Sequence, residues 1–258
     1  MLEYSDLERS PDGVAYLQYP RLSQNQKLVH GIFTRWGGVS DPPYNNLNTS
    51  YTVGDHAENV TANLLKIREA LGATHLIFMN QSHGDVVLAL HRGSFEFSGE
   101  IPSADAIITD APRIALMVKL ADCQGVMLFD PKRKVVANVH CGWRGNVRNI
   151  LGRVIALMKQ EFGCEGSDLL AAISPSLGPC CAEFVSHKEI FPQSFGRFMV
   201  GKNYFDLWSL SCSQLVEAGL REEDIELAAI CTRCRTDLFF SYRGEGTTGR
   251  FATVAMLR

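Results

Sequence analysis

Apolar residues recur with helical spacing in residues 57–71, where Val60, Leu64 and Ile67 fall on one face. Asp55, followed three residues later by Glu58, is typical of a capping box at the start of such a helix. The same reasoning predicts two further helices, over 146–163 and 207–218, each ending at a glycine.

Apolar runs of strand length, rich in β-branched residues, occupy much of the remaining chain. They are residues 28–34, 76–79, 85–90, 106–109, 114–120, 126–129, 135–140, 169–173, 239–242 and 251–257. Strands outnumber helices, and short turns such as Asp130-Pro131-Lys132 join some neighbours. The pattern predicts an α/β (α+β) sandwich, with a mixed, largely antiparallel sheet flanked by helices.

Composition agrees with one domain over residues 1–258. A chain of this length with 46% hydrophobic residues can bury a full core, and it has no internal repeat or long linker. A net charge of -3 gives no electrostatic reason to bind nucleic acid or an anionic membrane, so small-molecule partners are expected. No secretory signal or membrane-length apolar run is evident, which favours a cytoplasmic protein, with a monomer as the default.

Metal-capable side chains stand at the ends of three predicted strands. They are His83 in NQSHGD, Cys123 in ADC and His140 in VHCGWRG. These residues are far apart in sequence, so no local clip such as CxxC would hold a metal. A site assembled from distant strand ends is compatible with catalytic zinc, which takes three protein ligands and leaves a fourth position for water.

The same residues allow other interpretations. A lone histidine beside a strand is usually a structural polar residue, and a lone cysteine is usually part of the core. Alternatively, Cys123 is a thiolate nucleophile with His140 or His83 as its base, as in a cysteine hydrolase. Metal content separates these alternatives, because a zinc-bound thiolate is no longer free to attack a substrate.

The chain has eight cysteines. Cys231 and Cys234 form a CxxC motif without a second CxxC, so a functional role for this pair is not expected. Cys180, Cys181 and Cys212 are interpreted as packing residues, because free cysteine commonly behaves as a small buried hydrophobe.

Several motifs together resemble the YfiH-like family, whose members are called polyphenol oxidases of the laccase-domain type or purine nucleoside phosphorylases. They are HGIFTRWGGVS (30–40), PYNNLN (43–48), GD (54–55), QSHGD (81–85), ADC (121–123), VHCGWRG (139–145) and TGR (248–250). The resemblance implies a single α/β domain and a Zn²⁺ ion held by His83, Cys123 and His140. It also implies phosphorolysis of adenosine, inosine, guanosine and methylthioadenosine, with phosphate as co-substrate, and deamination of adenosine. Cys141 and Gly244-Glu245 depart from the usual pattern, and the second departure weakens any phosphate role near Arg243.

Given that activity, further roles can be assigned from chemistry. Asp85 and Asp122 are the carboxylates nearest in sequence to the proposed ligands, and deamination needs an acid or base beside the attacking water. Arg35 and Arg144 are the expected phosphate clamps, since the planar guanidinium matches phosphate geometry.

The laccase name can be tested against histidine content. A multicopper oxidase needs roughly ten histidines, usually in HxH pairs, whereas this chain has seven and no such pair. Cu²⁺ could still replace zinc in a three-ligand site. The alternatives are therefore a cysteine hydrolase or peptidoglycan peptide-editing enzyme, a copper-dependent polyphenol oxidase, and a noncatalytic metal-binding protein.

Overall fold

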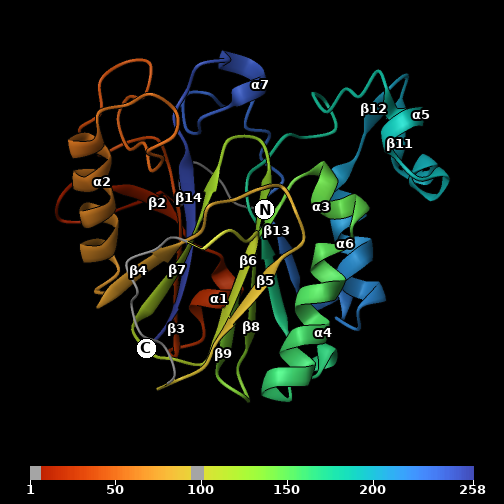
Figure 1. Cartoon of the computed structure of the whole chain (residues 1–258), viewed down its shortest axis with the longest axis horizontal. Coiled ribbons are helices and arrows are strands. Elements are labelled where there is room, and N and C mark those ends of the chain that lie inside the picture. Colours follow the sequence, from red (N-terminus) through yellow and green to blue (C-terminus); the bar gives the residue numbers. More distant parts are fainter. Residues whose placement is uncertain (1–6, 94–101) are drawn as a thin grey trace.

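The computed structural model describes residues 7–93 and 102–258. Residues 1–6, part of the segment in which no secretory signal is expected, lie outside the described residues. Within the described part, two six-stranded sheets form the centre of the molecule (Figure 1).

The first sheet has the order β1-β2-β3-β14-β7-β4. Its strands are β1 (Glu8–Arg9), β2 (Ala15–Leu17), β3 (Leu28–Phe33), β14 (Phe251–Leu257), β7 (Ile114–Leu120) and β4 (His75–Phe78). Only β4 and β7 pair in parallel among these strands.

The second sheet has the order β13-β10-β8-β9-β6-β5. Its strands are β13 (Ile225–Leu227), β10 (Leu170–Ile173), β8 (Gln124–Asp130), β9 (Val135–Cys141), β6 (Ala106–Thr109) and β5 (Val87–Leu90). The outermost pair at each edge is parallel and the inner pairs are antiparallel. The expected fold class, a mixed and largely antiparallel sandwich with flanking helices, is therefore confirmed.

In residues 7–93 and 102–258, the remaining elements are short apart from three helices. They are α1 (Pro20–Ser23), α2 (Ala57–Ala70), α3 (Trp143–Val147), α4 (Ile150–Phe162), α5 (His187–Ile190), α6 (Leu207–Glu217), α7 (Tyr242–Glu245), three 3-10 helices (Gly166–Asp168, Gln193–Phe198, Glu222–Asp224), and the two-stranded sheet of β11 (Met199–Gly201) and β12 (Tyr204–Phe205).

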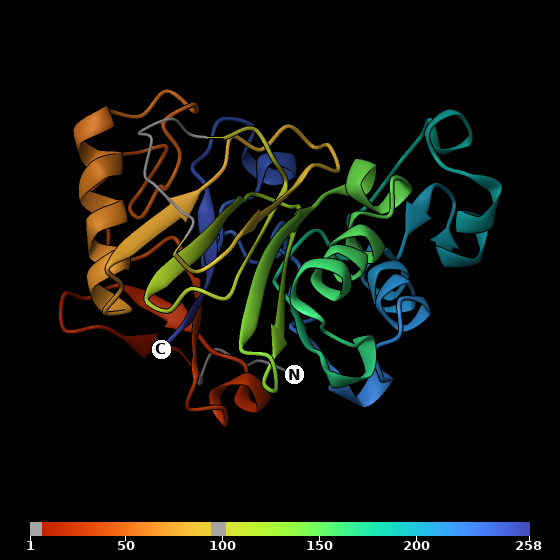
Figure 2. The same cartoon turned by 60° about the horizontal axis from the view of Figure 1, so that its bottom comes forward.

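The elements stack in four layers, with α2 outside the first sheet and α4 and α6 outside the second (Figures 1 and 2). The main core lies between the sheets, where Leu116 and Val118 of β7 join the same buried cluster as Met127 and Phe129 of β8. Apolar side chains of α2 and α4 fill the two outer interfaces. Burial on both faces explains why the central strands are apolar along almost their whole length.

The structure corrects the expected start of the first long helix. His56, not Asp55, is its N-cap, and no side chain caps it. The Asp55 carboxylate instead accepts hydrogen bonds from Ser40 Oγ (2.6 Å), Asn48 Nδ2 (2.9 Å) and the amide of His56 (2.8 Å). The proposed capping box is wrong because residues of the preceding loop use the oxygens of Asp55.

Two other elements differ from the sequence-based expectation. The helix expected over 146–163 is two helices, since Asn149 adopts a left-handed conformation (φ 52°) and caps α4 through its side chain. The strand expected over 239–242 is absent: Phe239 and Phe240 are fully buried in the main core, whereas Tyr242 begins α7. Their apolar character reflects core packing and not strand pairing.

No helix in residues 7–93 or 102–258 is long and apolar enough to cross a membrane.

Candidate metal centre and active site

The candidate site lies where the chain passes from one sheet to the other. The loop between β4 and β5 carries His83, and the connection between β7 and β8 carries Cys123. Both segments cross from the first sheet to the second, and His140 stands near the end of β9 beside them. The structure brings all three side chains together, with their ligand atoms within 4.8 Å of one another.

The buried carboxylate of Asp105 organises this group. Its Oδ1 accepts the amide of His83 (3.0 Å) and lies 2.8 Å from Nδ1 of His140. Its Oδ2 accepts from the amides of Ser82 (3.3 Å) and Gly84 (2.7 Å) and from Ser82 Oγ (3.0 Å). Asp105 thus fixes the loop that carries His83 and the ring of His140. It leaves Nε2 of His140 free to bind a metal, which is the usual arrangement for a metal-binding histidine and its carboxylate partner.

The backbone of the site is conformationally demanding. His83 (φ 57°) and Asp122 (φ 87°) both lie in the left-handed region, which non-glycine residues occupy mainly where the surroundings enforce it. A Cβ atom at Gly142 would lie 2.8 Å from Sγ of Cys123, so only glycine leaves room for the thiol there.

Gln81 attaches the histidine loop to the first sheet. Its side-chain amide donates to the carbonyl of Lys119 (2.8 Å), and its side-chain oxygen accepts the amide of Lys119 (2.9 Å). This pair of bonds imitates strand pairing beyond the end of β4, and so fixes the position of His83 two residues later.

The charges of the cluster are coupled. Burial opposes ionisation of Cys123, but the neighbouring His140 and His83 outweigh it and lower the pKa of the thiol to about 6. Burial would lower the pKa of His140, but the charge of Cys123 and the hydrogen bond to Asp105 raise it to about 9. The two shifts are mutual, because the charged form of each side chain favours the charged form of the other. A metal binds the deprotonated thiol and the neutral imidazole, so metal binding here is coupled to proton release.

Asp105 itself stays ionised. Burial alone would raise its pKa, but hydrogen bonds from His140, Gly84 and Ser82 lower it to about 2. It can therefore serve as a permanent negative partner for His140 across the physiological pH range.

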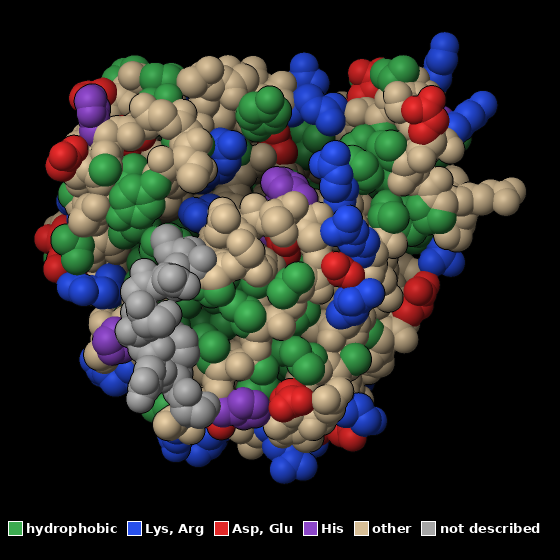
Figure 3. Space-filling view, in the orientation of Figure 1, with side chains coloured by type: hydrophobic (Ala, Val, Ile, Leu, Met, Phe, Trp, Pro, Cys, Tyr) green, Lys and Arg blue, Asp and Glu red, His purple; other side chains and the backbone are tan. Residues whose placement is uncertain are grey.

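The cluster opens into a cavity of about 500 Å³, to which all three side chains contribute. Cationic side chains line it, namely Lys119, Arg144, Arg243 and Arg250. Burial, and then the charge of Arg250, lower the pKa of Lys119 to about 8. Figure 3 shows a hollow in the upper middle of the face, with Lys and Arg side chains around it.

Apolar and aromatic side chains form another part of the cavity wall. Trp143, Phe184, Leu177, Leu207 and Tyr242 all contribute to the lining. A pocket that combines such surfaces with a few charged groups suits a ligand with a flat ring and an anionic or polar end.

The other four residues proposed from the sequence divide into two pairs. Arg144 and Asp122 line the cavity; Arg144 stacks on Trp143 (4.3 Å to the ring centroid) and Asp122 accepts bonds from Thr232 and Ser241. In the described part of the chain, the cavity lining includes neither Arg35 nor Asp85.

Each of the two outlying residues has partners elsewhere. Arg35 is buried and donates to Glu245 Oε1 (2.8 Å) and to the carbonyl of Thr236. Asp85 forms an ion pair with Arg153 (3.0 Å).

Sequence reasoning missed Asp105, Lys119 and Arg250. The only signal for Asp105 is a single charge directly before an apolar strand, in SADAIIT. Lys119 breaks the apolar run of β7, and Arg250 belongs to the TGR motif, but neither pattern indicates a cavity.

The fold and site define an α/β protein with a His-Cys-His centre in a cationic cavity. The chain belongs to the family described as multi-copper polyphenol oxidoreductase laccase, whose model matches residues 29–258. Curated relatives named purine nucleoside phosphorylase include one from Bacteroides thetaiotaomicron, 31% identical over 93% of this chain and 96% of its own length. Another, from Streptomyces griseus, is 34% identical over 87% of this chain and 92% of its own length.

Solved structures agree with this assignment. Bacillus licheniformis YfiH superposes with a TM-score of 0.86 at 27% identity, and covers 99% of this chain and all (100%) of its own. YlmD from Geobacillus stearothermophilus gives a TM-score of 0.85, also at 27% identity, over 98% of this chain and 99% of its own. The resemblance to the YfiH-like family is therefore confirmed, and the relatives' names support an enzyme.

The donor set fits one zinc ion better than a multicopper centre. Two imidazoles and one thiolate that open onto a cavity match the three-ligand arrangement of catalytic zinc. Only two of the chain's seven histidines belong to this cluster, and His30 accepts the amide of Tyr19 within the core. A four-copper centre has no matching set of ligands in the described residues.

Proposed function

We propose that this chain is a zinc-dependent purine nucleoside phosphorylase that acts on adenosine, inosine, guanosine and methylthioadenosine, and that it also deaminates adenosine. One observation carries the proposal: a single cavity places the His83, Cys123 and His140 cluster beside cationic and aromatic side chains. One chain supplies all of these groups, so a monomer is sufficient for the proposed activity. Residues 1–258 would then act as one catalytic domain.

The cations of the cavity are proposed to bind phosphate. Lys119 and Arg250 lie close enough for the charge of Arg250 to lower the pKa of Lys119, and a phosphate dianion between them would relieve that repulsion. Arg144 is a third candidate, because it lines the same cavity. Arg35 is a weaker candidate than the sequence suggests, because Glu245 already neutralises it.

Phosphorolysis then requires one substitution at the sugar. A phosphate oxygen forms a bond to C1′ of the ribose as the bond between C1′ and N9 of the purine breaks. The electron pair leaves with the purine, which takes up a proton, and ribose 1-phosphate remains. Lys119 and Arg250 would orient the phosphate, and Trp143 or Phe184 offers a flat surface for the base.

Asp105 acts as a positioning residue for His140 in this proposal. Asp105 holds Nδ1 of His140 and so keeps Nε2 directed away from it. A zinc ion held by the three ligands would supply a Lewis acid that polarises an oxygen atom or lowers the pKa of water. In adenosine deamination, the oxygen of water adds at C6 and ammonia leaves. Asp122 is the candidate acid or base, because it is the one carboxylate among the described residues that line the cavity.

A product assay with the zinc-replete protein tests this proposal. The protein is incubated with each nucleoside, with and without inorganic phosphate, and bases, ribose 1-phosphate and inosine are separated by chromatography. Phosphate-dependent formation of adenine and ribose 1-phosphate in equal amounts is expected, and inosine reports deamination. Cys123→Ser should abolish both, whereas Cys212→Ser, outside the cavity, should retain them. Absence of both activities from the zinc-replete protein would contradict the proposal.

A second candidate is a cysteine hydrolase, including a peptidoglycan peptide-editing enzyme. One observation favours it: His140 lies between Asp105 and Cys123, in the order of a Cys-His-Asp triad. A metal-free active protein that loses activity on alkylation of Cys123 would favour the hydrolase; one active only with zinc bound would favour the phosphorylase.

A further inference from the structure

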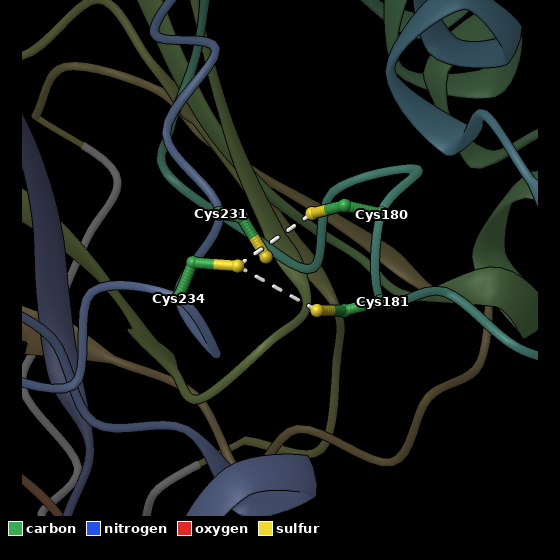
Figure 4. Close-up of side chains that lie close together, drawn as sticks. All are labelled: Cys180, Cys181, Cys231 and Cys234. Atoms are coloured by element: carbon green, nitrogen blue, oxygen red, sulfur yellow. Dashed lines mark hydrogen bonds between the residues drawn. The ribbon is translucent and has the colours of Figure 1, made fainter.

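Four cysteines gather in a second group, separate from the candidate active site. They are Cys180, Cys181, Cys231 and Cys234, and their sulfur atoms all lie within 4.8 Å of one another. Figure 4 shows them pointing from two loops into one small space. The sequence-based interpretation of Cys180 as a packing residue is therefore wrong: its side chain is exposed, as is that of Cys234.

The spacing of these sulfurs matches a metal centre. A tetrahedral zinc site with bonds of about 2.3 Å has sulfur-to-sulfur edges of about 3.8 Å. Sγ of Cys234 lies 3.7 Å from Sγ of Cys180 and 3.6 Å from Sγ of Cys181. A disulfide needs about 2.05 Å, so these contacts are those of four free thiols around a common centre.

The backbone around the group supports a fixed arrangement. The amide of Gly178 donates to Sγ of Cys231 (3.3 Å), a contact that stabilises a thiolate. The two loops also pair through Ser176 and Cys231, where the amide of Thr232 donates to the carbonyl of Ser176 (3.0 Å). The loops are therefore held together by backbone contacts before any metal binds.

We propose that these four cysteines form a second metal site, a tetrathiolate centre that takes zinc or a similar thiophilic divalent cation. Four protein ligands complete a tetrahedron and leave no position for water or substrate, so the site is structural. The cluster of His83, Cys123 and His140, with only three ligands, is not of this kind.

The position of this centre gives it a defined task. The loop that carries Cys180 and Cys181 lies between Leu177 and Phe184, which line the cavity. The loop that carries Cys231 and Cys234 also carries Thr232. The hydroxyl of Thr232 donates to Asp122 (2.7 Å), the neighbour of Cys123 in the chain. A metal that joins the loops would therefore hold one wall of the candidate active site in place.

Metal stoichiometry and ligand type test the proposal on the full-length chain. Protein prepared under reducing conditions is loaded with zinc, desalted and measured by elemental analysis. Wild-type protein should retain two zinc ions per chain, and Cys180→Ser/Cys234→Ser should retain one. Cys212→Ser is the matched control, since it removes a half-buried thiol from outside both groups and should retain two.

X-ray absorption of the Cys123→Ser variant gives a second readout that leaves the four cysteines intact. This variant should hold a zinc ion with four sulfur neighbours at about 2.3 Å. Zinc with fewer than three sulfur neighbours in this variant would overturn the proposal. So would a folded Cys180→Ser/Cys234→Ser variant, checked by circular dichroism, that retains as many zinc ions as wild type.

Discussion

Replacing Asp105 with asparagine tests the organisation of the candidate metal centre with a minimal change in size. The carboxylate accepts five hydrogen bonds, two at Oδ1 and three at Oδ2. An asparagine amide replaces one oxygen with a donor, so at least two of these donors lose their acceptor in either orientation. The fixed negative charge beside His140 is lost as well.

The size of the effect follows from this count. Loss of a hydrogen-bonding partner behind a metal-binding histidine weakens metal affinity by roughly 10- to 100-fold, or about 1.4 to 2.8 kcal/mol. Each donor left unpaired also costs about 1 to 3 kcal/mol of folding stability. We expect Asp105→Asn to bind zinc about 10- to 100-fold more weakly and to unfold at a lower denaturant concentration.

Zinc affinity is measured by competition with a chromophoric chelator. The four-cysteine group is first removed by substitution or saturated with zinc, so that the measurement reports only the site of His83, Cys123 and His140. Asp130→Asn is the matched control: Asp130 is equally buried, but lies at the opposite end of the β8–β9 hairpin, where it accepts the amides of Lys132 and Arg133. The control should keep the wild-type zinc affinity. A folded Asp105→Asn protein that binds zinc as tightly as wild type would refute the reasoning.

Three further substitutions test the surroundings of the centre. Gly142→Ala places a Cβ 2.8 Å from Sγ of Cys123 and should weaken zinc binding at least about tenfold. Gly196→Ala is the control, because open space surrounds Gly196, and it should keep the wild-type zinc affinity. Equal zinc affinities for the two variants would contradict the steric argument. Because the pKa of Lys119 is lowered to about 8, its positive charge is present below pH 8 and is lost above it, so the KM for phosphate should rise above pH 8. Lys119→Met should show a high KM at every pH, and a wild-type KM without this rise would exclude Lys119. Arg144→Ala should raise the KM for phosphate roughly tenfold; an unchanged KM would remove Arg144 from the phosphate site.

The central strands are predictable from sequence because burial on both faces demands continuous apolar runs. The strands β7 and β14 match their expected bounds for this reason. Local rules fail where a distant residue competes for the same atoms. Asp55 resembles a helix cap, yet Ser40 and Asn48 take its oxygens.

The candidate active site and the four-cysteine group also divide into parts with a local sequence pattern and parts that depend on distant residues. The motifs around His83, Cys123 and His140 are contiguous, so they are visible in the sequence even though the residues meet only in the fold. Asp105 gives no comparable signal, because its role depends on donors that two other segments bring to it, residues 82–84 and His140. The four-cysteine group is hidden for a similar reason: CxxC supplies two ligands, and the other two come from a loop about fifty residues earlier.

Anomalous diffraction at the zinc absorption edge, from crystals of the zinc-loaded protein, tests the candidate active site most directly. We expect a peak about 2.0–2.1 Å from a ring nitrogen of both His83 and His140, and about 2.3 Å from Sγ of Cys123, where these side chains line the cavity. The absence of a peak there, in crystals that contain zinc elsewhere, would contradict the account.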